Sequence, residues 1–177
     1  MVKNDVQIKQ GKEAEKNFLK IFPLIKKASK HEDIHGHWDV MVEIDGGSVK
    51  VDVKGIKNDD RFDPYPNENI NWVEIQNADG NTGWLYGDSD VIAFETDEYF
   101  ILVGTLKLRR FLEKKMGYTQ DTIKDIKPNH VKDPYVFFQR KDRKDILVKV
   151  KTIDLMHIKY RSIEKKPKKV AKKVANR

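Results

Sequence analysis

The stretch "HWDVMVEIDGGSVKVDVKG", residues 37–55, decides the fold of this chain. Apolar and polar residues alternate on both sides of Asp45-Gly46-Gly47, which is typical of two strands joined by a tight turn. The alternation places one set of side chains on a hidden face and the other on an exposed face. The hidden set is Trp38, Val40, Val42, Ile44, Val49, Val51 and Val53, and the exposed set is Asp39, Met41, Glu43, Asp45, Ser48, Lys50, Asp52 and Lys54.

The exposed face carries two aspartates and a lysine far from the turn. If Gly46-Gly47 forms the two-residue loop, Asp39 lies opposite Lys54 and diagonal to Asp52. Opposed Cβ atoms are about 4.5–5.5 Å apart and diagonal ones about 7–8 Å. Carboxylates this close raise each other's pKa unless a cation lies between them. A divalent ion such as Mg²⁺ is the natural occupant, because it takes oxygen ligands. The alternative is an ordinary solvated face with alternating charges.

These residues resemble the PD-(D/E)xK nuclease superfamily, with Asp39 in "HWDV" and Asp52-Val53-Lys54 in "VDVKG". Trp38 stands where the family name has proline. The resemblance covers roughly residues 10–115, where the family's order is helix, three strands, helix and strand. It implies an α/β protein with a restriction-endonuclease-like core, a central mixed β-sheet flanked by helices. The residues after 115 resemble no family that we can name.

The resemblance also implies roles for the residues of the motif. Asp39, Asp52 and the backbone carbonyl of Val53 would bind Mg²⁺ or Mn²⁺. Lys54 would position or deprotonate the attacking water and steady charge on the phosphate. Both roles agree with general chemistry, because a metal lowers the pKa of bound water and a fixed cation stabilises charge that develops in the transition state.

A glutamate on the first helix is a further candidate. The spacing of Ala14, Phe18, Ile21 and Phe22 predicts a helix over residues 11–22 that Pro23 closes. Glu15 lies at the edge of the apolar stripe of this helix. Many relatives in the resembled family carry a glutamate here that reaches the metal site. A solvated or capping role is the alternative, and Glu13 is the neighbouring candidate.

The segment 71–77, "NWVEIQN", predicts a third strand in which Glu74 and Gln76 alternate with apolar residues. If this strand pairs beside residues 50–55, both side chains share the polar face of Asp52 and Lys54. They would then hold a water or a metal ion, as polar residues do at this place in the resembled family. A plain surface role is the alternative for each.

Two other clusters have competing explanations. His31, His35 and His37 have spacing that suits zinc, but Gly36 favours a solvated loop near the active site. Trp84 and Tyr86, in a glycine-rich segment, either stack on bases or pack under the loop, and the second explanation is favoured. The rest of the chain predicts strands over 91–96 and 99–104, a helix over 105–116 with Thr105 as N-cap, a hairpin of 135–140 with 146–151, and a short helix over 152–160.

Composition adds a basic tail. The chain has 177 residues, a net charge of +7 and no cysteine, which suits one domain without disulfides. Seven of the 35 basic residues and one of the 28 acidic residues lie in residues 164–177, so six of the seven net charges belong there. We therefore expect a domain over residues 1–163 and a disordered basic arm over 164–177 that attracts polyanions. Its nucleic-acid-binding candidates are Lys165, Lys166, Lys168, Lys169, Lys172 and Lys173.

The function that the sequence predicts is a Mg²⁺- or Mn²⁺-dependent deoxyribonuclease, endonuclease rather than exonuclease, with DNA as its partner. A phage or mobile-element origin and a homodimer are compatible with the resemblance. The segment "MVKNDVQIKQ" lacks an apolar signal core and no run is long enough to span a membrane, so we expect a cytoplasmic location. The alternatives are a catalytically inactive nuclease-fold protein that binds nucleic acid and an RNA-binding accessory protein guided by the tail.

Overall fold

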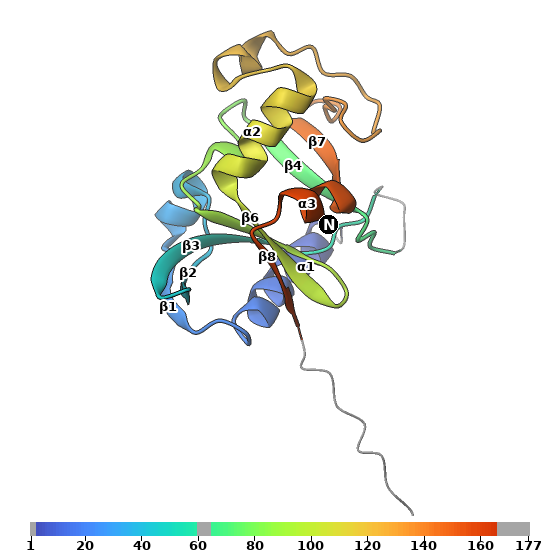
Figure 1. Cartoon of the computed structure of the whole chain (residues 1–177). Coiled ribbons are helices and arrows are strands. Elements are labelled where there is room, and N and C mark those ends of the chain that lie inside the picture. Colours follow the sequence, from blue (N-terminus) through green and yellow to red (C-terminus); the bar gives the residue numbers. More distant parts are fainter. Residues whose placement is uncertain (1–2, 60–64, 166–177) are drawn as a thin grey trace, which may run out of the picture.

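A six-stranded mixed sheet forms the centre of the molecule, in the order β1-β2-β3-β5-β6-β8. The computed structural model describes residues 3–59 and 65–165 (Figure 1). β3 and β5 pair in parallel, and the other neighbouring pairs are antiparallel. The strands are β1 (Leu24–Lys27), β2 (Val40–Ile44), β3 (Gly47–Lys54), β5 (Val91–Glu95), β6 (Tyr99–Gly104) and β8 (Arg161–Glu164).

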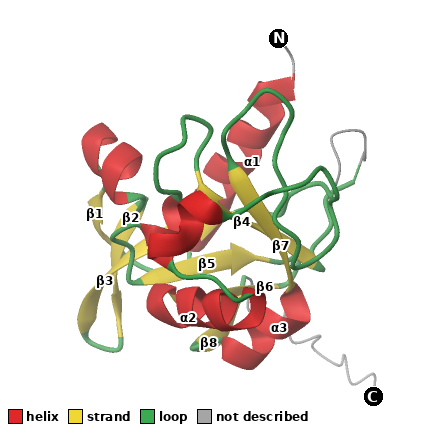
Figure 2. Cartoon of the chain, turned by 90° about the horizontal axis from the view of Figure 1, so that it is seen from above, coloured by secondary structure: helices red, strands yellow, loops and turns green. Residues whose placement is uncertain are grey.

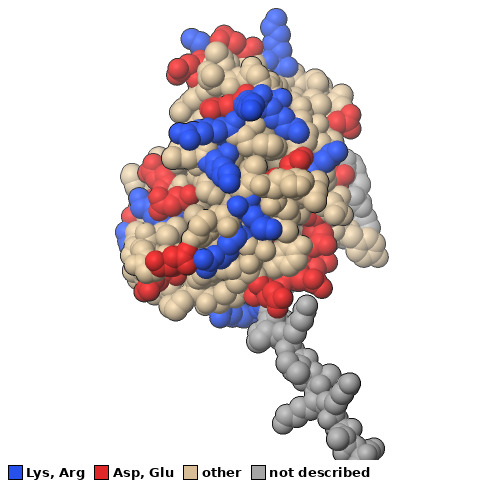
Figure 3. Space-filling view, in the orientation of Figure 1, with Lys and Arg blue, Asp and Glu red and all other residues tan. Residues whose placement is uncertain are grey.

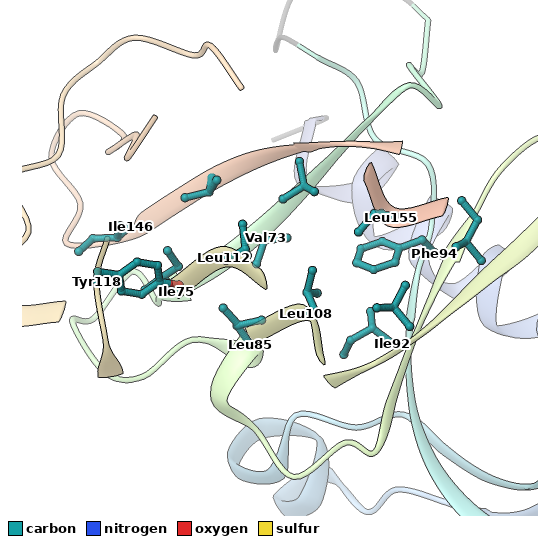
Figure 4. Packing of buried hydrophobic residues seen from close by; sticks show 14 residues of the cluster. Val73, Ile75, Leu85, Ile92, Phe94, Leu108, Leu112, Tyr118, Ile146 and Leu155 are labelled. Atoms are coloured by element: carbon teal, nitrogen blue, oxygen red, sulfur yellow. The ribbon is translucent and has the colours of Figure 1, made fainter. Parts of the chain in front are cut away.

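The two faces of the sheet carry separate cores. On one face, α1 (Lys3–Phe18) packs Ala14 and Phe18 against the valines of β2 and β3. On the other face lie α2 (Thr105–Met116), α3 (Thr152–Ile158) and a two-stranded sheet of β4 (Ile70–Gln76) and β7 (Ile146–Lys151) (Figures 1 and 2). Figure 4 shows Ile92 and Phe94 of β5 facing Leu108 of α2 within this second core. The expected α/β class is therefore confirmed.

The turn of the central hairpin uses Asp45-Gly46, whereas the sequence analysis placed the loop at Gly46-Gly47. Ile44 pairs with Gly47, and both turn residues have positive φ, 52° for Asp45 and 80° for Gly46. Two positive φ angles define the type I′ turn, whose twist matches that of antiparallel strands. The predicted register was therefore wrong by two residues. The two faces were right because side chains alternate with a period of two.

Strand pairing differs from the expectation at several places. β4 exists as predicted but pairs with β7 and not with β3. The central sheet instead gains β1 and β8, two short edge strands that the sequence analysis did not identify. The predicted hairpin of residues 135–140 with 146–151 is reduced to isolated bridges, of which Phe138 with Leu147 is one. Such pairings depend on contacts distant in sequence, which alternation alone does not encode.

Helix ends also needed correction. α1 ends at Phe18, four residues earlier than predicted, and residues 19–22 follow as a turn in which the N–H groups of Ile21 and Phe22 both bond to the Phe18 carbonyl. α2 begins at Thr105, but Thr105 is not a side-chain cap, because its hydroxyl lies 3.1 Å from Ser89 Oγ. None of the helices within the described ranges combines the length and the apolar content that crossing a membrane requires.

The first lysine of the predicted tail belongs to the folded domain. Lys165 Nζ lies 2.8 Å from Glu95 Oε1 and donates to the carbonyl of Thr96, while its backbone N–H bonds to Glu98. Its assignment to a disordered arm was therefore wrong. The other five tail candidates, Lys166, Lys168, Lys169, Lys172 and Lys173, lie outside the described residues.

Candidate active site

Asp39 and Asp52 lie side by side on neighbouring strands. Val40 pairs with Val51, so Asp39, one residue earlier, falls beside Asp52. The expected position of Asp39 opposite Lys54 was wrong. In the observed register Asp39 lies beside Asp52, and the two carboxylates are closer together than in the diagonal arrangement that the sequence analysis predicted. The pair also stays on one face of the sheet, so the juxtaposition that the sequence suggested is present in a tighter form.

Backbone hydrogen bonds fix Asp39 at the entrance to β2. Its N–H donates to the carbonyl of Val51 at 2.9 Å, and its carbonyl accepts from Ala28 at 2.9 Å. Its carboxylate oxygen Oδ2 accepts the N–H of Val53 at 2.7 Å. The N–H and C=O of one strand residue point to the same side, so the Val53 carbonyl faces the side of β3 on which Asp39 lies. Asp39 and Asp52 thus bring two carboxylates together, and the Val53 carbonyl lies on the β2 side of the same strand.

Asp52 is a buried acid with an elevated proton affinity. Its exposed fraction is 2%, and its neighbour on β5, Ile92, belongs to the buried core on that face of the sheet. The pKa of Asp52 is raised to about 7, mainly by burial; Lys54 opposes the rise, and the neighbouring Asp39 adds to it. Asp52 Oδ2 lies 2.7 Å from Lys54 Nζ, and the adjacent Asp39 adds a second carboxylate to the same ammonium. The carboxylate is therefore incompletely compensated and suited to a further cation.

Lys54 lies between this acid and an aromatic ring. Its ammonium is 4.5 Å from the centroid of the Trp84 ring, within range of a cation–π contact. Trp84 begins the 3₁₀ turn η2 (Trp84–Tyr86), which packs on β4. A Cβ at Gly83 would come within 2.5 Å of the Glu74 carbonyl oxygen, so only glycine permits this approach. The sequence analysis treated this turn as a loop, and its Trp84 ring lies under Lys54. Trp84 also packs against the core, in agreement with the favoured explanation that it packs under the loop.

The positive charge of Lys54 lowers the pKa of two residues that the sequence analysis did not assign to the site, His37 and Lys57. Burial lowers the pKa of His37, and Lys54 lowers it further. Burial also lowers the pKa of Lys57, with Lys54 acting in the same direction and Asp52 opposing it. Lys57 comes three residues after Lys54, in a loop, and strand alternation gave no signal for it. The site thus holds a second lysine near Asp52.

Glu74 and Gln76 separate in space. Burial raises the pKa of Glu74, Lys54 opposes that shift, and the backbone N–H of Trp84 bonds to the Glu74 carboxylate. Glu74 therefore lies close to Lys54 although its strand is not paired with β3. The Gln76 amide donates to the carbonyl of Lys144 at 2.5 Å. Gln76 lines a cavity of about 340 Å³ whose lining does not include Lys54. The structure therefore brings Glu74, but not Gln76, near Lys54.

Glu15 and Asp39 line one groove, which we call the α1 groove. It has a volume of about 570 Å³ and lies between α1 and the segment 27–39. The Glu15 carboxylate pairs with Lys27 Nζ at 3.2 Å, whereas Glu13 is exposed and faces Lys16. Glu15 rather than Glu13 is thus turned toward Asp39. The other lining residues are Lys12, Lys16, Leu19, Lys20, Lys27, Ala28 and Asp33.

The histidine segment forms a helical turn rather than the expected loop. The turn η1 (Glu32–Gly36) is capped reciprocally by Ser29 and Glu32, a signal present in the sequence. His31 and His35 stack with ring centroids 4.5 Å apart, and both are exposed. Among the described residues, no group of three or more His, Asp or Glu side chains is arranged to hold a metal ion.

The residues of the carboxylate pair nevertheless fit Mg²⁺ or Mn²⁺ chemically. Mg²⁺ in proteins is commonly bound by one or two carboxylates and keeps several waters. Asp39 and Asp52 supply two carboxylates, and the Val53 carbonyl adds a neutral oxygen on the same side.

Comparisons with known proteins identified no relative: no family model, no curated protein and no solved structure matches the chain.

Proposed function

We propose that this chain is a metal-dependent DNA endonuclease of the PD-(D/E)xK type. The observation that carries the proposal is the convergence of Asp39, Asp52 and Lys54 on one face of the β2–β3 ladder, with the ammonium of Lys54 2.7 Å from Asp52. A face that needed only to be soluble would not bury an aspartate to 2% exposure beside a second one.

The order of elements supports the same proposal. A helix precedes a three-stranded antiparallel meander, β1 to β3, and β5 then adds in parallel beside β3. This matches the helix, three strands and further strand of the resembled core. The crossover from β3 to β5 departs from it, because β4 and η2 stand where the family has a helix.

Each residue has a chemical task in this proposal. Asp39, Asp52 and the Val53 carbonyl would hold the metal ion. When bound, the ion lowers the pKa of water and stabilises negative charge on a phosphate. Lys54 places a positive charge beside the same phosphate, where charge grows during attack. Asp52 keeps Lys54 oriented, and the Trp84 ring limits the directions in which the ammonium can point.

The test is nicking of covalently closed plasmid DNA in Mg²⁺, which requires no strand ends and thus separates endonucleases from exonucleases. Asp52→Asn and Lys54→Met should each abolish nicking, because the first removes a charged oxygen ligand and the second removes the cation. Glu43→Ala is the matched control, since Glu43 is an exposed acid on the same hairpin. Nicking that survives both active-site changes would sink the proposal.

A second candidate is a nuclease-like protein that binds nucleic acid without cutting it. The observation that favours this candidate is the row of lysines at positions 12, 16 and 20 along one groove, which suits a polyanion whether or not it is cut. It predicts DNA binding that does not depend on Mg²⁺ and no nicking by the wild-type protein. The plasmid assay therefore decides between the two.

A further inference from the structure

The α1 groove has a basic wall. Lys12, Lys16 and Lys20 line it from the α1 side, and the core residues Ala14 and Phe18 point to the opposite side of α1. Lysines four residues apart lie on one face of a helix. Lys12 and Lys16 lie on α1, and Lys20 lies in the turn that follows Phe18. The lysines therefore form a row and not a scattered surface charge.

We propose that the α1 groove holds the sugar-phosphate backbone of one DNA strand, with Lys12, Lys16 and Lys20 neutralising its phosphates and Asp39 as the member of the carboxylate pair that lines the groove. This inference rests on the proposed function and names the path of its substrate. A helix rises about 6 Å between lysines four residues apart. A DNA strand presents a phosphate about every 3.4 Å along its axis, so each lysine has a partner within reach.

Four lysines and three carboxylates, those of Glu15, Asp33 and Asp39, line the groove, and the three lysines of the α1 wall lie together on one side of it. Lys27 already pairs with Glu15 at 3.2 Å. The contacts of the other lysines within the protein are weak: Lys16 lies 4.0 Å from an exposed Glu13, and Lys20 bonds to the neutral Asn17. Exposed pairs of this kind contribute little to stability. Lys16 and Lys20 can therefore exchange these contacts for phosphates.

A second basic surface supplies the control. Figure 3 shows Lys and Arg side chains over α2 and over the stretch where α3 leads to β8. On α2 the exposed basic residues are Lys107, Arg110, Lys114 and Lys115, and the first three lie on one face of the helix like the α1 lysines. α2 packs on the opposite face of the sheet, in the core that does not contain α1. None of these cations lines the α1 groove.

The experiment measures binding of the full chain to a labelled DNA duplex in EDTA, as a function of NaCl concentration. Neutralising Lys12, Lys16 and Lys20 to glutamine should reduce the slope of log K against log salt by about 3, since each lost phosphate contact removes about one counterion. The matched variant, Lys107→Gln with Arg110→Gln and Lys114→Gln, removes the same charge and should keep the wild-type slope. Thermal denaturation of each variant checks that the fold is intact.

Three outcomes overturn the inference: a wild-type slope in the α1 variant, an equal loss in the α2 variant, or no DNA binding by the wild type. Binding in EDTA requires no chemistry, so the two proposals can fail separately. If the α1 variant has a reduced salt slope and the wild type does not nick plasmid, DNA binding in the α1 groove is supported and the nuclease proposal is refuted. If Asp52→Asn abolishes nicking and the α1 slope is unchanged, the nuclease stands and the groove falls.

Discussion

The Lys54 ammonium lies 2.7 Å from the Asp52 carboxylate, on a strand that neighbouring strands bury on both edges. The pair is asymmetric, because Asp52 is 3% exposed at its side chain and Lys54 is 25% exposed. Asp52 therefore depends on its neighbours for compensation, while Lys54 can reach solvent or a ligand. This asymmetry determines how the site should respond to pH, to metal ions and to substitution.

The stability of the metal-free protein should fall as pH rises from about 4 to about 7. Asp52 has a pKa of about 7 in the folded state against 3.8 for the ordinary group. Between these two pKa values the folded state keeps a proton that the unfolded state has lost. The free energy of unfolding therefore decreases as pH rises through this range. The full effect is up to about 4 kcal/mol. Thermal denaturation in EDTA should show this slope in the wild type and a smaller one in Asp52→Asn. Equal slopes would mean that Asp52 does not titrate in this range.

Binding of Mn²⁺ should release a proton near neutral pH. About half of the Asp52 side chains are protonated at pH 7 if the pKa is about 7, and the metal requires the carboxylate. Calorimetry in two buffers with different ionisation enthalpies should therefore give about 0.5 proton released at pH 7 and almost none at pH 9. Asp39→Asn should weaken or abolish the binding, and Glu43→Ala should not. Binding without any proton release would contradict the assignment of Asp52 as a ligand.

Trp84 should act as a positioning residue for Lys54. A cation–π contact of 0.5–2 kcal/mol corresponds to roughly 2- to 30-fold in rate. Trp84→Leu should slow nicking by about that factor at unchanged Mn²⁺ affinity, and Trp84→Phe should restore most of the rate. Trp72→Leu is the control, because Trp72 of β4 also lies under a lysine, but that lysine is Lys149. Equal losses in Trp84→Phe and Trp84→Leu would indicate a merely structural role.

Gly83→Ala should destabilise the protein and reduce activity together. A Cβ at this position would lie 2.5 Å from a backbone oxygen of Glu74, so η2 must move away from β4. Overpacking of this kind lowers the free energy of unfolding by about 1–3 kcal/mol. Gly104→Ala is the matched control, since the nearest atom to its Cβ would be 3.9 Å away and its φ is −60°. Urea denaturation of both variants measures the difference, and equal stability would refute the close approach.

Lys165 should contribute to stability and the rest of the tail to DNA binding. Lys165→Met leaves Glu95, which is 9% exposed, without its ion pair and should lower the free energy of unfolding by about 1–3 kcal/mol. Deleting residues 166–177 should leave the melting temperature unchanged and make the salt dependence of DNA binding shallower. A deletion that lowers the melting temperature as much as Lys165→Met would contradict this division.

Local patterns determined much of what the sequence analysis predicted. Alternation in residues 38–54 fixed which face of the hairpin carries Asp39, Asp52 and Lys54, since the side-chain period of a strand does not depend on register. The spacing of the apolar residues in 105–116 likewise predicted the helix α2. The basic tail followed from composition alone.

The tertiary structure decided the rest. The turn residues shifted the register by two and put Asp39 beside Asp52 in place of Lys54. Pairing of β3 with β5, forty residues away, buried Asp52 and raised its pKa, and packing of η2 on β4 brought Trp84 under Lys54. These effects come from contacts between segments far apart in the chain, whose free energies depend on the whole fold. A period read along the sequence carries no information about them.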